Sequence, residues 1–455
     1  MAAGIALSGG LAKTDGEVSM TDGAMLHEKK RFTEGLTGYH YLVLVVACLA
    51  WSFETFDQWL FVFSKQRAIA ELLGPAGADA KLVGSWTNIA TAALMIGWAT
   101  GGLFFGMIGD RLGRTRTLQL TILMYAVLSG LSGVAQDVYQ FSALRFLMGL
   151  GVGGEFAAGA ALVAEAFPIH ARATALSSVQ AASALGNVLA AVVNGTFSHA
   201  GLSWRWLFSV GVVPAIILAI VFSYVHEPEV WVQARAVAKK GKGSLGSLLA
   251  LFREPLLRRH TLIGVSLAAV GVIGFWGVGV LTPELLRSVL NPKNLAELKS
   301  VTEDKVSFAG IAQNLGCFFG ALTFGYVAQR LGRRTGFMLA FLGCMVMVPA
   351  AFFLTTTFLM ALVLFFLLGF MLLSVLSGFA VYFPELFPTR MRSTGTGFCY
   401  NVARYITAGM LFATIPIRAS LGMAGMVYAV MAVYVIGCLI ILFVAPETKG
   451  KPLPE

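Results

Sequence analysis

Charged side chains are scarce in this 455-residue chain: only 12% of its residues are Asp, Glu, Lys or Arg, whereas 57% are hydrophobic. Soluble domains average about 25% charged residues, so the composition excludes an ordinary soluble enzyme. The chain also lacks a Gly-Lys-Ser/Thr phosphate loop, which argues against an ATP-driven pump. Five cysteines show no pairing pattern, and no motif for a metal or cofactor is present. We therefore expect a protein that is not an enzyme and needs no cofactor.

Long apolar runs take the place of the missing charges. A helix of about 20 apolar residues crosses roughly 30 Å of hydrocarbon, and the runs lack the strict alternation of barrel strands. We predict an all-α integral membrane protein with twelve transmembrane helices. The predicted spans are 41–63, 86–108, 117–135, 141–164, 173–197, 207–225, 262–281, 308–327, 337–353, 359–383, 396–416 and 426–444.

The spans divide the chain into two sets of six. We expect a disordered tail over 1–38, a six-helix half over 39–226, a polar linker over 227–260, a second six-helix half over 261–447 and a short tail over 448–455. The first 38 residues contain no apolar core of the kind that a cleavable signal peptide needs. The two halves are therefore the expected architectural units.

Basic residues predict the orientation, because Lys and Arg gather in cytoplasmic loops. With the N-terminus inside, 22 of the 33 Lys and Arg residues fall on the inner side. Both termini are thus predicted to be cytoplasmic, in a multi-pass plasma membrane protein. Attraction to anionic lipid explains the net charge of +10 without a nucleic-acid partner. We expect a monomer.

Three motifs recur at a nearly constant offset. The segment 106–114, which contains Asp110, Arg111 and Arg114, recurs 219 positions later at 325–333. Glu165 with Arg172 recurs 220 positions later as Glu385 with Arg392, and Glu227 recurs as Glu447 at the same offset. The chain is therefore predicted to consist of two pseudo-repeats, an architecture that places a binding site near the membrane midplane between the halves.

These motifs resemble those of the major facilitator superfamily. The segment 106–114 resembles its Gly-x-x-x-Asp-Arg-x-Gly-Arg loop, Arg145 with Gly149 and Gly151 resembles its fourth-span motif, and Pro446 to Gly450 resembles the ending of sugar porters and organic-ion carriers. The resemblance implies the major facilitator fold, transport of a small-molecule substrate and alternating access. The run Gly153 to Gly159 further resembles bacterial metabolite and sialic-acid symporters, which implies a bacterial inner membrane.

Charged residues at the predicted cytoplasmic helix ends form a candidate gate, because opposite charges there can pair when the inner side closes. The alternative is positive-inside topology with solvated ion pairs of little energetic value. Gln329 stands where the repeat leads us to expect an Asp, so a symmetric gate is in doubt. The predicted gate residues are Asp110, Arg111, Arg114, Glu165, Arg172, Glu227, Arg330, Arg333, Glu385, Arg392 and Glu447.

Ionisable residues inside spans are costly and indicate function. Glu54, Asp57 and Gln58 are spaced i, i+3, i+4 and so share one helix face, which must point into the bundle. The resemblance to proton-coupled sugar porters assigns proton coupling to Asp57 and Arg145. The alternative is a static ion pair in an uncoupled facilitator. Glu54 and Glu155 are further candidates for proton coupling, and Glu155 has a purely structural role as its alternative.

Polar residues of other spans are the candidate substrate ligands. Gln180, Asn187 and Asn194 follow one another at intervals of seven residues, and their alternative role is helix-to-helix hydrogen bonding. Arg404 invites a carboxylate, and its alternative is a scaffold pair with Glu54 or Glu155. The predicted substrate-binding residues are Gln58, Gln180, Asn187, Asn194, Trp276, Asn314, Tyr400 and Arg404.

The sequence as a whole favours a secondary transporter that takes up a small organic anion with a proton. A sugar or polyol carrier is the main alternative, although the resemblance leaves the sugar site incomplete around Trp276. A drug antiporter is disfavoured because span 173–197 contains no proline, and a sensor would usually add a large soluble domain.

Overall fold

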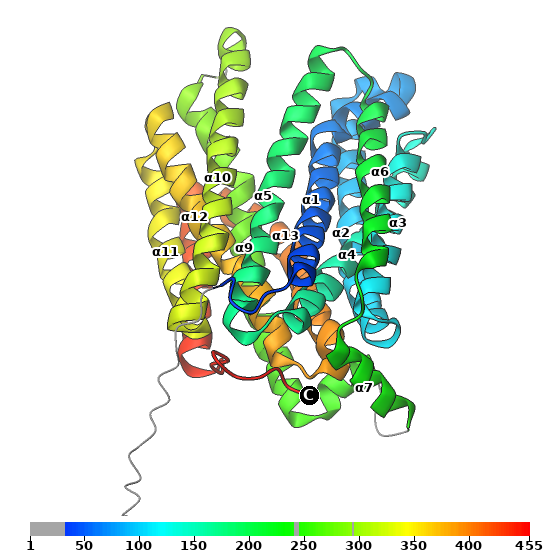
Figure 1. Cartoon of the computed structure of the whole chain (residues 1–455). Helices are drawn as coiled ribbons and strands as arrows, with labels where there is room; N and C mark the ends of the chain where they lie inside the picture. Colours follow the sequence, from blue (N-terminus) through cyan, green and yellow to red (C-terminus); the bar gives the residue numbers. More distant parts are fainter. Residues whose placement is uncertain (1–31, 241–244, 294) are drawn as a thin grey trace, which may run out of the picture.

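The computed structural model describes residues 32–240, 245–293 and 295–455, and within them every regular element is a helix. The predicted tail 1–38 lies mostly outside the described residues. Figure 1 shows the helices as two groups that stand side by side, with the C-terminus at the lower end between them.

The first group of helices, here called the first half, contains six long α-helices. Each corresponds to one predicted span; four of them extend beyond it at both ends, while α3 and α6 begin earlier and end three to four residues before it. They are α1 (Gly38–Leu72), α2 (Ala80–Leu112), α3 (Arg114–Ser132), α4 (Val138–Ala166), α5 (Ile169–His199) and α6 (Trp204–Val221), with 3-10 turns at Gly74–Ala78 and Phe222–Tyr224.

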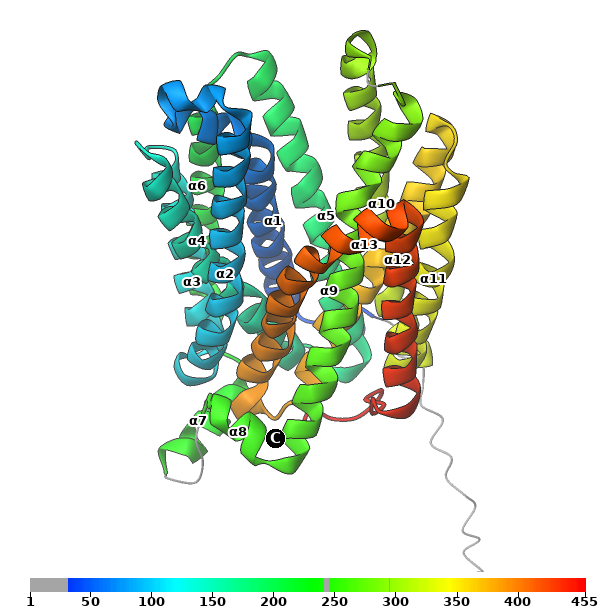
Figure 2. The ribbon, with the colours of Figure 1, turned by 180° about the vertical axis from the view of Figure 1, so that it is seen from behind.

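The linker and the second half follow. The predicted linker contains the short helices α7 (Glu229–Lys239) and α8 (Leu248–Arg253). The second half consists of α9 (Pro255–Leu290), α10 (Lys299–Leu331), α11 (Arg333–Leu354), α12 (Phe358–Leu386) and α13 (Arg392–Phe443), with 3-10 turns at Ala296–Leu298 and Thr389–Met391. The helix α13 covers the last two predicted spans, because Gly422 has φ +63° and breaks it into two parts. Figure 2 shows α13 rising diagonally and then turning back.

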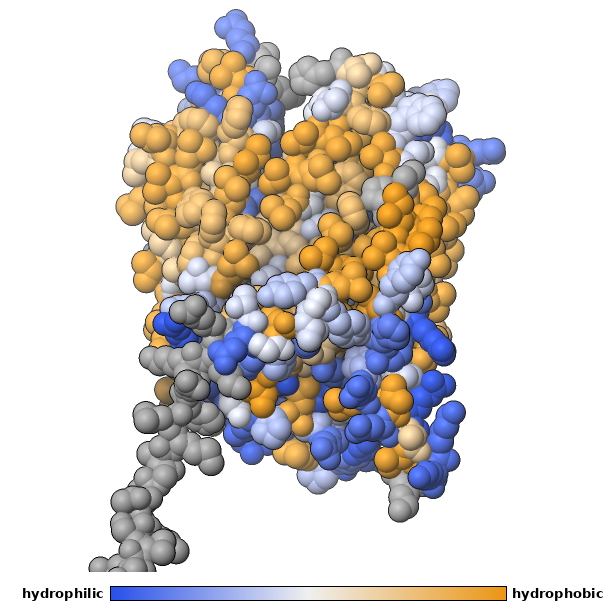
Figure 3. Space-filling view, viewed as in Figure 1, coloured by the Kyte–Doolittle hydropathy of each residue, from blue (hydrophilic) through white to orange (hydrophobic). Residues whose placement is uncertain are grey.

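The outer surface fits a membrane. Ten of the helical segments in the described chain are long and apolar enough to cross one. The helix α3 and the part of α13 before Gly422 occupy the third and eleventh predicted spans but are not among these ten. Figure 3 shows hydrophobic side chains over the upper part of the molecule and hydrophilic ones gathered at its lower end. The chain is therefore a multi-pass membrane protein.

The two halves meet mainly through two helix pairs, α2 with α13 and α5 with α10, and α4 and α12 also take part. Every hydrogen bond, ion pair and ring contact between the halves that is described lies between the middle of these helices and the lower end, from Thr100–Tyr405 and Asn187–Asn314 down to Glu165–Arg392. We call the lower end the closed face. Toward the opposite face α5 and α10 diverge in both ribbon views (Figures 1 and 2).

Glycines in α2 and α4 set the position of the polar residues on α4. A Cβ on Gly153 would lie 2.0 Å from the carbonyl oxygen of Trp98, and one on Gly101 would lie 2.0 Å from that of Leu150. Only glycine permits so close an approach between two helices. The helix α4 begins at Val138 because the Asp137 carboxylate caps it. This carboxylate accepts hydrogen bonds from the backbone N–H groups of Tyr139 and Gln140, at 2.9 and 2.8 Å.

Candidate substrate-binding site

The polar face of α1 lies inside the first half, as its spacing predicts. Glu54 and Asp57 are 0% and 2% exposed, and Gln58 is also buried. The Gln58 amide donates a hydrogen bond to Glu54 Oε1, while Glu54 Oε2 has no hydrogen-bond partner. A buried carboxylate oxygen without a hydrogen-bond donor is costly. Packing alone does not explain these polar residues, which indicates a functional role for this face of α1.

Asp57 and Arg145 lie near each other without touching. No ion pair within 4 Å joins them among the described residues, although each lies in the electrostatic field of the other. Two serines of α3 bind them instead: Ser129 donates to Asp57 Oδ1, and Arg145 donates to Ser132 Oγ. The free atoms Asp57 Oδ2 and Arg145 Nη1 are both buried and lack partners. Each group therefore keeps a hydrogen-bonding atom that no described residue satisfies.

Aromatic rings surround the Arg145 guanidinium. Its central carbon lies 4.8 Å from the Phe208 ring centroid and 5.5 Å from those of Phe61 and Phe141. Cation–π attraction from desolvated rings contributes about 2 kcal/mol, which partly offsets the cost of burying the charge. The rings also separate Arg145 from water.

Glu155 on α4 is a second buried acid. It is 1% exposed, and neither carboxylate oxygen has a hydrogen-bond partner among the described residues. Its field acts on Glu54 and on the Tyr125 hydroxyl, which also lacks a partner. A buried charge of this kind is too costly to leave unpaired, so the neutral, protonated form of Glu155 suits this position.

Arg404 on α13 faces this cluster from the second half. Its guanidinium carbon lies 3.5 Å from the Trp98 ring centroid and 4.4 Å from that of Tyr400, and its Nη1 donates to Asn401 Oδ1 at 2.5 Å. No carboxylate of the described chain lies within 4 Å, although Glu54 acts on it electrostatically. Two aromatic rings therefore lie against the guanidinium, a planar cation of the kind that binds carboxylates.

The predicted amide ligands fall into separate environments. Asn187 donates to Asn314 Oδ1 at 2.8 Å across the two halves, which joins two predicted residues. Asn194 accepts from Arg67 at 3.2 Å, further toward the opposite face. Trp276 is half-buried beside Phe275 and makes no described contact with the other predicted ligands.

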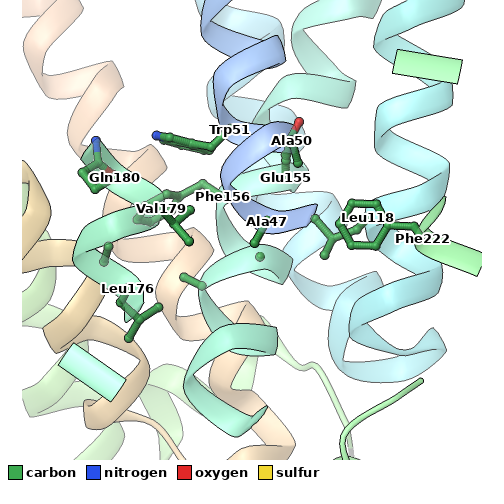
Figure 4. A pocket seen from close by; sticks show the side chains of 13 residues that line it. Ala47, Ala50, Trp51, Leu118, Glu155, Phe156, Leu176, Val179, Gln180 and Phe222 are labelled. Carbon is green, nitrogen blue, oxygen red and sulfur yellow. The ribbon is translucent and has the colours of Figure 1, made fainter. Parts of the chain in front are cut away.

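Gln180 lines a largely apolar pocket together with Trp51, Glu155 and Phe156. Figure 4 shows the Trp51 indole pointing toward the side of the pocket on which Gln180 lies, with Phe156 beneath them. The ring of Phe156 stacks on Tyr400 at 4.1 Å between centroids. The pocket therefore adjoins the surroundings of Arg404.

The closed face contains two equivalent sets of bonds, one within each half. Arg114 binds Glu165 at 2.8 Å and the Gly109 carbonyl at 2.8 Å. At the equivalent positions Arg333 binds Glu385 at 2.7 Å and the Ala328 carbonyl at 2.9 Å. The two copies of the motif therefore make equivalent hydrogen bonds.

Glu227 and Glu447 cap equivalent helices. Glu227 accepts from the backbone N–H of Arg114 at the start of α3, and Glu447 accepts from that of Arg333 at the start of α11. Burial raises the pKa of Glu447, but backbone N–H groups of Arg333, Lys449, Arg334 and Thr448 lower it further, so that its pKa lies below the usual value. These two acids thus act within a half rather than between halves.

The contacts between halves come from other members of the predicted gate. Asp110 accepts hydrogen bonds from the backbone N–H groups of Ser393 and Thr394 at 3.1 and 2.8 Å, and from the Thr394 hydroxyl at 2.5 Å. Glu165 also binds Arg392 at 2.6 Å, and Arg114 donates to the Thr389 carbonyl at 2.7 Å. These bonds join α2 and α4 to the start of α13.

The other predicted gate residues make weaker contacts. Arg172 donates to the carbonyls of Ala164 and Phe167 and forms no ion pair among the described residues. Arg111 donates to the Leu245 carbonyl, and Arg330 lies over the Tyr326 ring. Gln329, at the position equivalent to Asp110, makes a single bond across the halves, to the Ile169 carbonyl at 3.0 Å.

Several residues of the site were not predicted. Trp98, Tyr125 and Asn401 are aromatic or amide residues inside apolar runs, and only their polar atoms distinguish them from packing residues. Ser129 and Ser132 are spaced i, i+3, which is a weak signal in a span rich in small residues. No group of His, Cys, Asp and Glu that could hold a metal ion is found in the part of the chain that the structure describes.

Comparison with known proteins agrees with this architecture. The family model for the Major Facilitator Superfamily matches residues 41–297, and the model for Sugar (and other) transporters matches residues 326–455. The chain is 29% identical to the cis,cis-muconate transport protein of Acinetobacter baylyi, over 89% of this chain and 94% of that one. It is 27% identical to the sialic acid transporter NanX of Escherichia coli, over 90% and 94%.

A solved structure shares the fold. The proton:xylose symporter XylE, bound to 6-bromo-6-deoxy-D-glucose, superposes with a TM-score of 0.72 at 20% identity, over 91% of this chain and 98% of that one. Together with the family models and the two relatives, this likeness shows that the chain belongs to the Major Facilitator Superfamily and is a membrane transporter rather than an enzyme.

Proposed function

We propose that the chain carries a small organic anion together with a proton, by alternating access between its two halves. The observation that carries this proposal is Arg404: a cation inside the bundle with no carboxylate within 4 Å among the described residues. A partly buried cation is costly without a counter-charge, and a substrate carboxylate supplies one.

The names of the two relatives support an anionic substrate, since muconate and sialic acid both carry a carboxylate. Their bodies differ, because muconate is a flat conjugated dicarboxylate and sialic acid is polyhydroxylated. The names of the relatives therefore favour a negatively charged substrate but do not indicate its shape.

We assign proton coupling to Asp57 with Arg145, and to the acids Glu54 and Glu155. Asp57 and Arg145 are buried near each other, and each forms a hydrogen bond with a serine of α3 instead of with the other. If Arg145 moves toward Asp57 when the halves rock, the charged form of Asp57 is favoured and its proton leaves. Asp57→Asn should abolish accumulation driven by a proton gradient and should spare exchange. Full accumulation by this variant would refute the assignment.

The membrane arrangement belongs to the same proposal. We place the closed face and both termini in the cytoplasm, because most Lys and Arg residues lie at that end. The helices then make twelve spans in one monomer of a bacterial inner membrane. Gln180, Asn187, Asn194, Asn314, Trp276, Gln58 and Tyr400 remain the proposed substrate contacts beside Arg404.

A sugar or polyol facilitator is the second candidate. The match of residues 326–455 to the Sugar (and other) transporter model favours it. Amide side chains along α5 and α10 would then bind hydroxyl groups.

The test is uptake by the purified protein in liposomes, with and without an imposed inward proton gradient. A carboxylate such as benzoate and a neutral sugar such as xylose are compared. We expect carboxylate uptake that the gradient stimulates about tenfold or more. Sugar uptake that ignores the gradient would replace this proposal with the facilitator.

A further inference from the structure

A groove lies on the outer surface of the second half, between α9 and the end of α13, which run side by side (Figure 2). Its volume is about 360 Å³, within the range of sites that hold small molecules, about 300–1,000 Å³. We call it the arginine groove. It shares no residue with the surroundings of Arg404 or with the bonds of the closed face. It is lined by Pro255, Arg258, Arg259, Leu262, Ile263, Ser266, Ile440 and Val444.

The apolar part of the arginine groove faces the hydrocarbon of the membrane. Leu262 and Val444 are 57% and 43% exposed. The helix α9 and the segment Gly422–Phe443 of α13, which ends directly before Val444, are both long and apolar enough to cross a membrane. Exposed leucine and valine side chains on such helices contact acyl chains, which are as apolar as they are. A ligand that fits this part of the groove therefore has an apolar portion.

Two arginines stand at the other end of the groove, where the apolar run of α9 begins. Arg258 and Arg259 are both exposed, and neither forms an ion pair in the described chain. Glu254, the acid that precedes them, is already bound to Arg390 at 2.7 Å. Arg259 donates to the Val444 carbonyl at 3.5 Å, and no other side-chain hydrogen bond of either arginine is described. The pair therefore lacks a counter-charge from the described residues.

The arginine pair is not part of the repeated framework. At the offsets of 219 and 220 positions that relate the two halves, its equivalents fall within 38–40, where the sequence is Gly-Tyr-His. The Tyr39 hydroxyl there donates to the His226 carbonyl at 2.8 Å, inside the first half. One half thus forms the same fold without cations at this place, so the architecture of a half does not explain them.

We propose that the arginine groove binds one phospholipid of net negative charge, with its phosphate on Arg258 and Arg259 and an acyl chain along Leu262 and Ile440. Guanidinium groups bind phosphate oxygens in bidentate fashion, and basic pockets between membrane helices suit anionic head groups. Ser266 lies about two turns beyond Arg259 on α9, and its hydroxyl can donate to an ester carbonyl of the lipid.

The apolar walls favour a lipid over a free phosphate ion. A free ion satisfies the two arginines but leaves the leucine, isoleucine and valine side chains of the groove without a partner. The site is separate from the proposed substrate path, so it holds whether the chain carries an anion or a sugar.

Native mass spectrometry of the full-length protein in detergent tests the proposal, because it counts bound lipids. Phosphatidylglycerol is compared with phosphatidylcholine of the same acyl chains, since the two differ in net charge. We expect one phosphatidylglycerol to bind about tenfold more tightly than phosphatidylcholine. Arg258→Gln combined with Arg259→Gln should abolish this preference, and Lys at both positions should retain part of it. Equal binding of the two lipids by the parent, or an unchanged preference in the Gln variant, would overturn the proposal.

The matched control removes two charges at the same end of the molecule but outside the groove. Lys239 and Lys240 are exposed, at the end of α7 and directly after it, and Lys239→Gln combined with Lys240→Gln should keep the preference. Loss of the preference in this variant as well would show that general positive charge, rather than the groove, attracts the lipid. All variants should unfold near the temperature of the parent without added lipid, because the arginines make few bonds within the chain.

A block of the groove and a competitor test the place of the acyl chain. Ser266→Phe fills the groove with an apolar ring and leaves both arginines in place, so it should weaken phosphatidylglycerol binding about tenfold. Glycerol phosphate carries the phosphate without acyl chains, and about a hundredfold excess should not displace the lipid. Undiminished binding by Ser266→Phe, or displacement by glycerol phosphate, would overturn the proposal in favour of a site for a free anion.

Discussion

The two sides of the closed face differ although the two halves repeat each other. On the α2–α13 side, Asp110 holds the start of α13 and Glu165 is shared by Arg114 and Arg392, one from each half. On the α5–α10 side, Gln329 makes one bond to Ile169 and Arg172 forms no ion pair in the described chain. Identical bonds within the halves therefore stabilise each half, while the bonds that keep the face closed are concentrated on one side.

Loss of the shared carboxylate should have the largest effect on this difference. Glu165→Gln leaves two buried guanidinium groups without their common counter-charge, which costs about 3 kcal/mol and shifts the closed-to-open ratio by roughly a hundredfold. The measurement is the distance distribution between nitroxide labels at Arg116 and Thr335, which are exposed on the two halves at this face.

Glu385→Gln is the matched control, because Glu385 occupies the equivalent position but binds Arg333 and Thr448 within its own half. It should lower the unfolding temperature and leave the label distances short. Equal opening in the two variants would show that the face does not depend on the shared carboxylate.

Separate substitutions at the equivalent positions 110 and 329 should have an intermediate effect. Asp110→Asn weakens charge-assisted bonds to the N-terminus of α13, which we expect to raise the open population about tenfold. Gln329→Asp places a carboxylate near the N-terminus of α5, where it should favour closure and slow transport a few-fold. Label distances and liposome transport rates measure both. A more open face in Gln329→Asp would contradict the idea that this carboxylate is what the second side lacks.

Removal of a cap within one half should have the smallest effect. Glu447→Gln should cost about 1 kcal/mol of stability at neutral pH without any change in label distances, and Glu227→Gln should behave alike. The folded-state pKa of Glu447 lies below its usual 4.5, so its contribution is fully present above that pH and is lost as the pH falls through the folded pKa. Unfolding temperatures of the variant and the parent, measured from pH 7 down to pH 4, should therefore converge only at the acid end. A constant difference would exclude the charge as its cause.

Much of the fold could be predicted because its determinants are local. Apolar runs gave the positions of the helices, and the i, i+3, i+4 spacing of Glu54, Asp57 and Gln58 gave the face of α1 that turns inward. The constant offset between motifs anticipated the equivalent bonds of Arg114 and Arg333. Helix ends were less predictable, since several helices continue beyond the apolar run.

The contacts between distant segments were beyond sequence reasoning. Asp110 binds backbone N–H groups of Ser393 and Thr394, and a backbone donor leaves no mark in the sequence. The two serines that form hydrogen bonds with Asp57 and Arg145 resemble the other small residues of their span. Arg404 was recognised as a cation inside the bundle and Tyr400 as its neighbour on the same helix, but the Trp98 ring comes from α2 and could not be identified beforehand.

Two arginines inside the bundle have different proposed roles, Arg404 in substrate binding and Arg145 in proton coupling, and direct binding separates them. Arg404→Gln and Arg145→Gln are compared with the parent protein in calorimetric titrations with benzoate and in proton-driven liposome uptake. We predict that Arg404→Gln loses at least about tenfold in benzoate affinity, while Arg145→Gln still binds benzoate but no longer accumulates it. Unchanged benzoate binding by Arg404→Gln, or full accumulation by Arg145→Gln, would contradict the account.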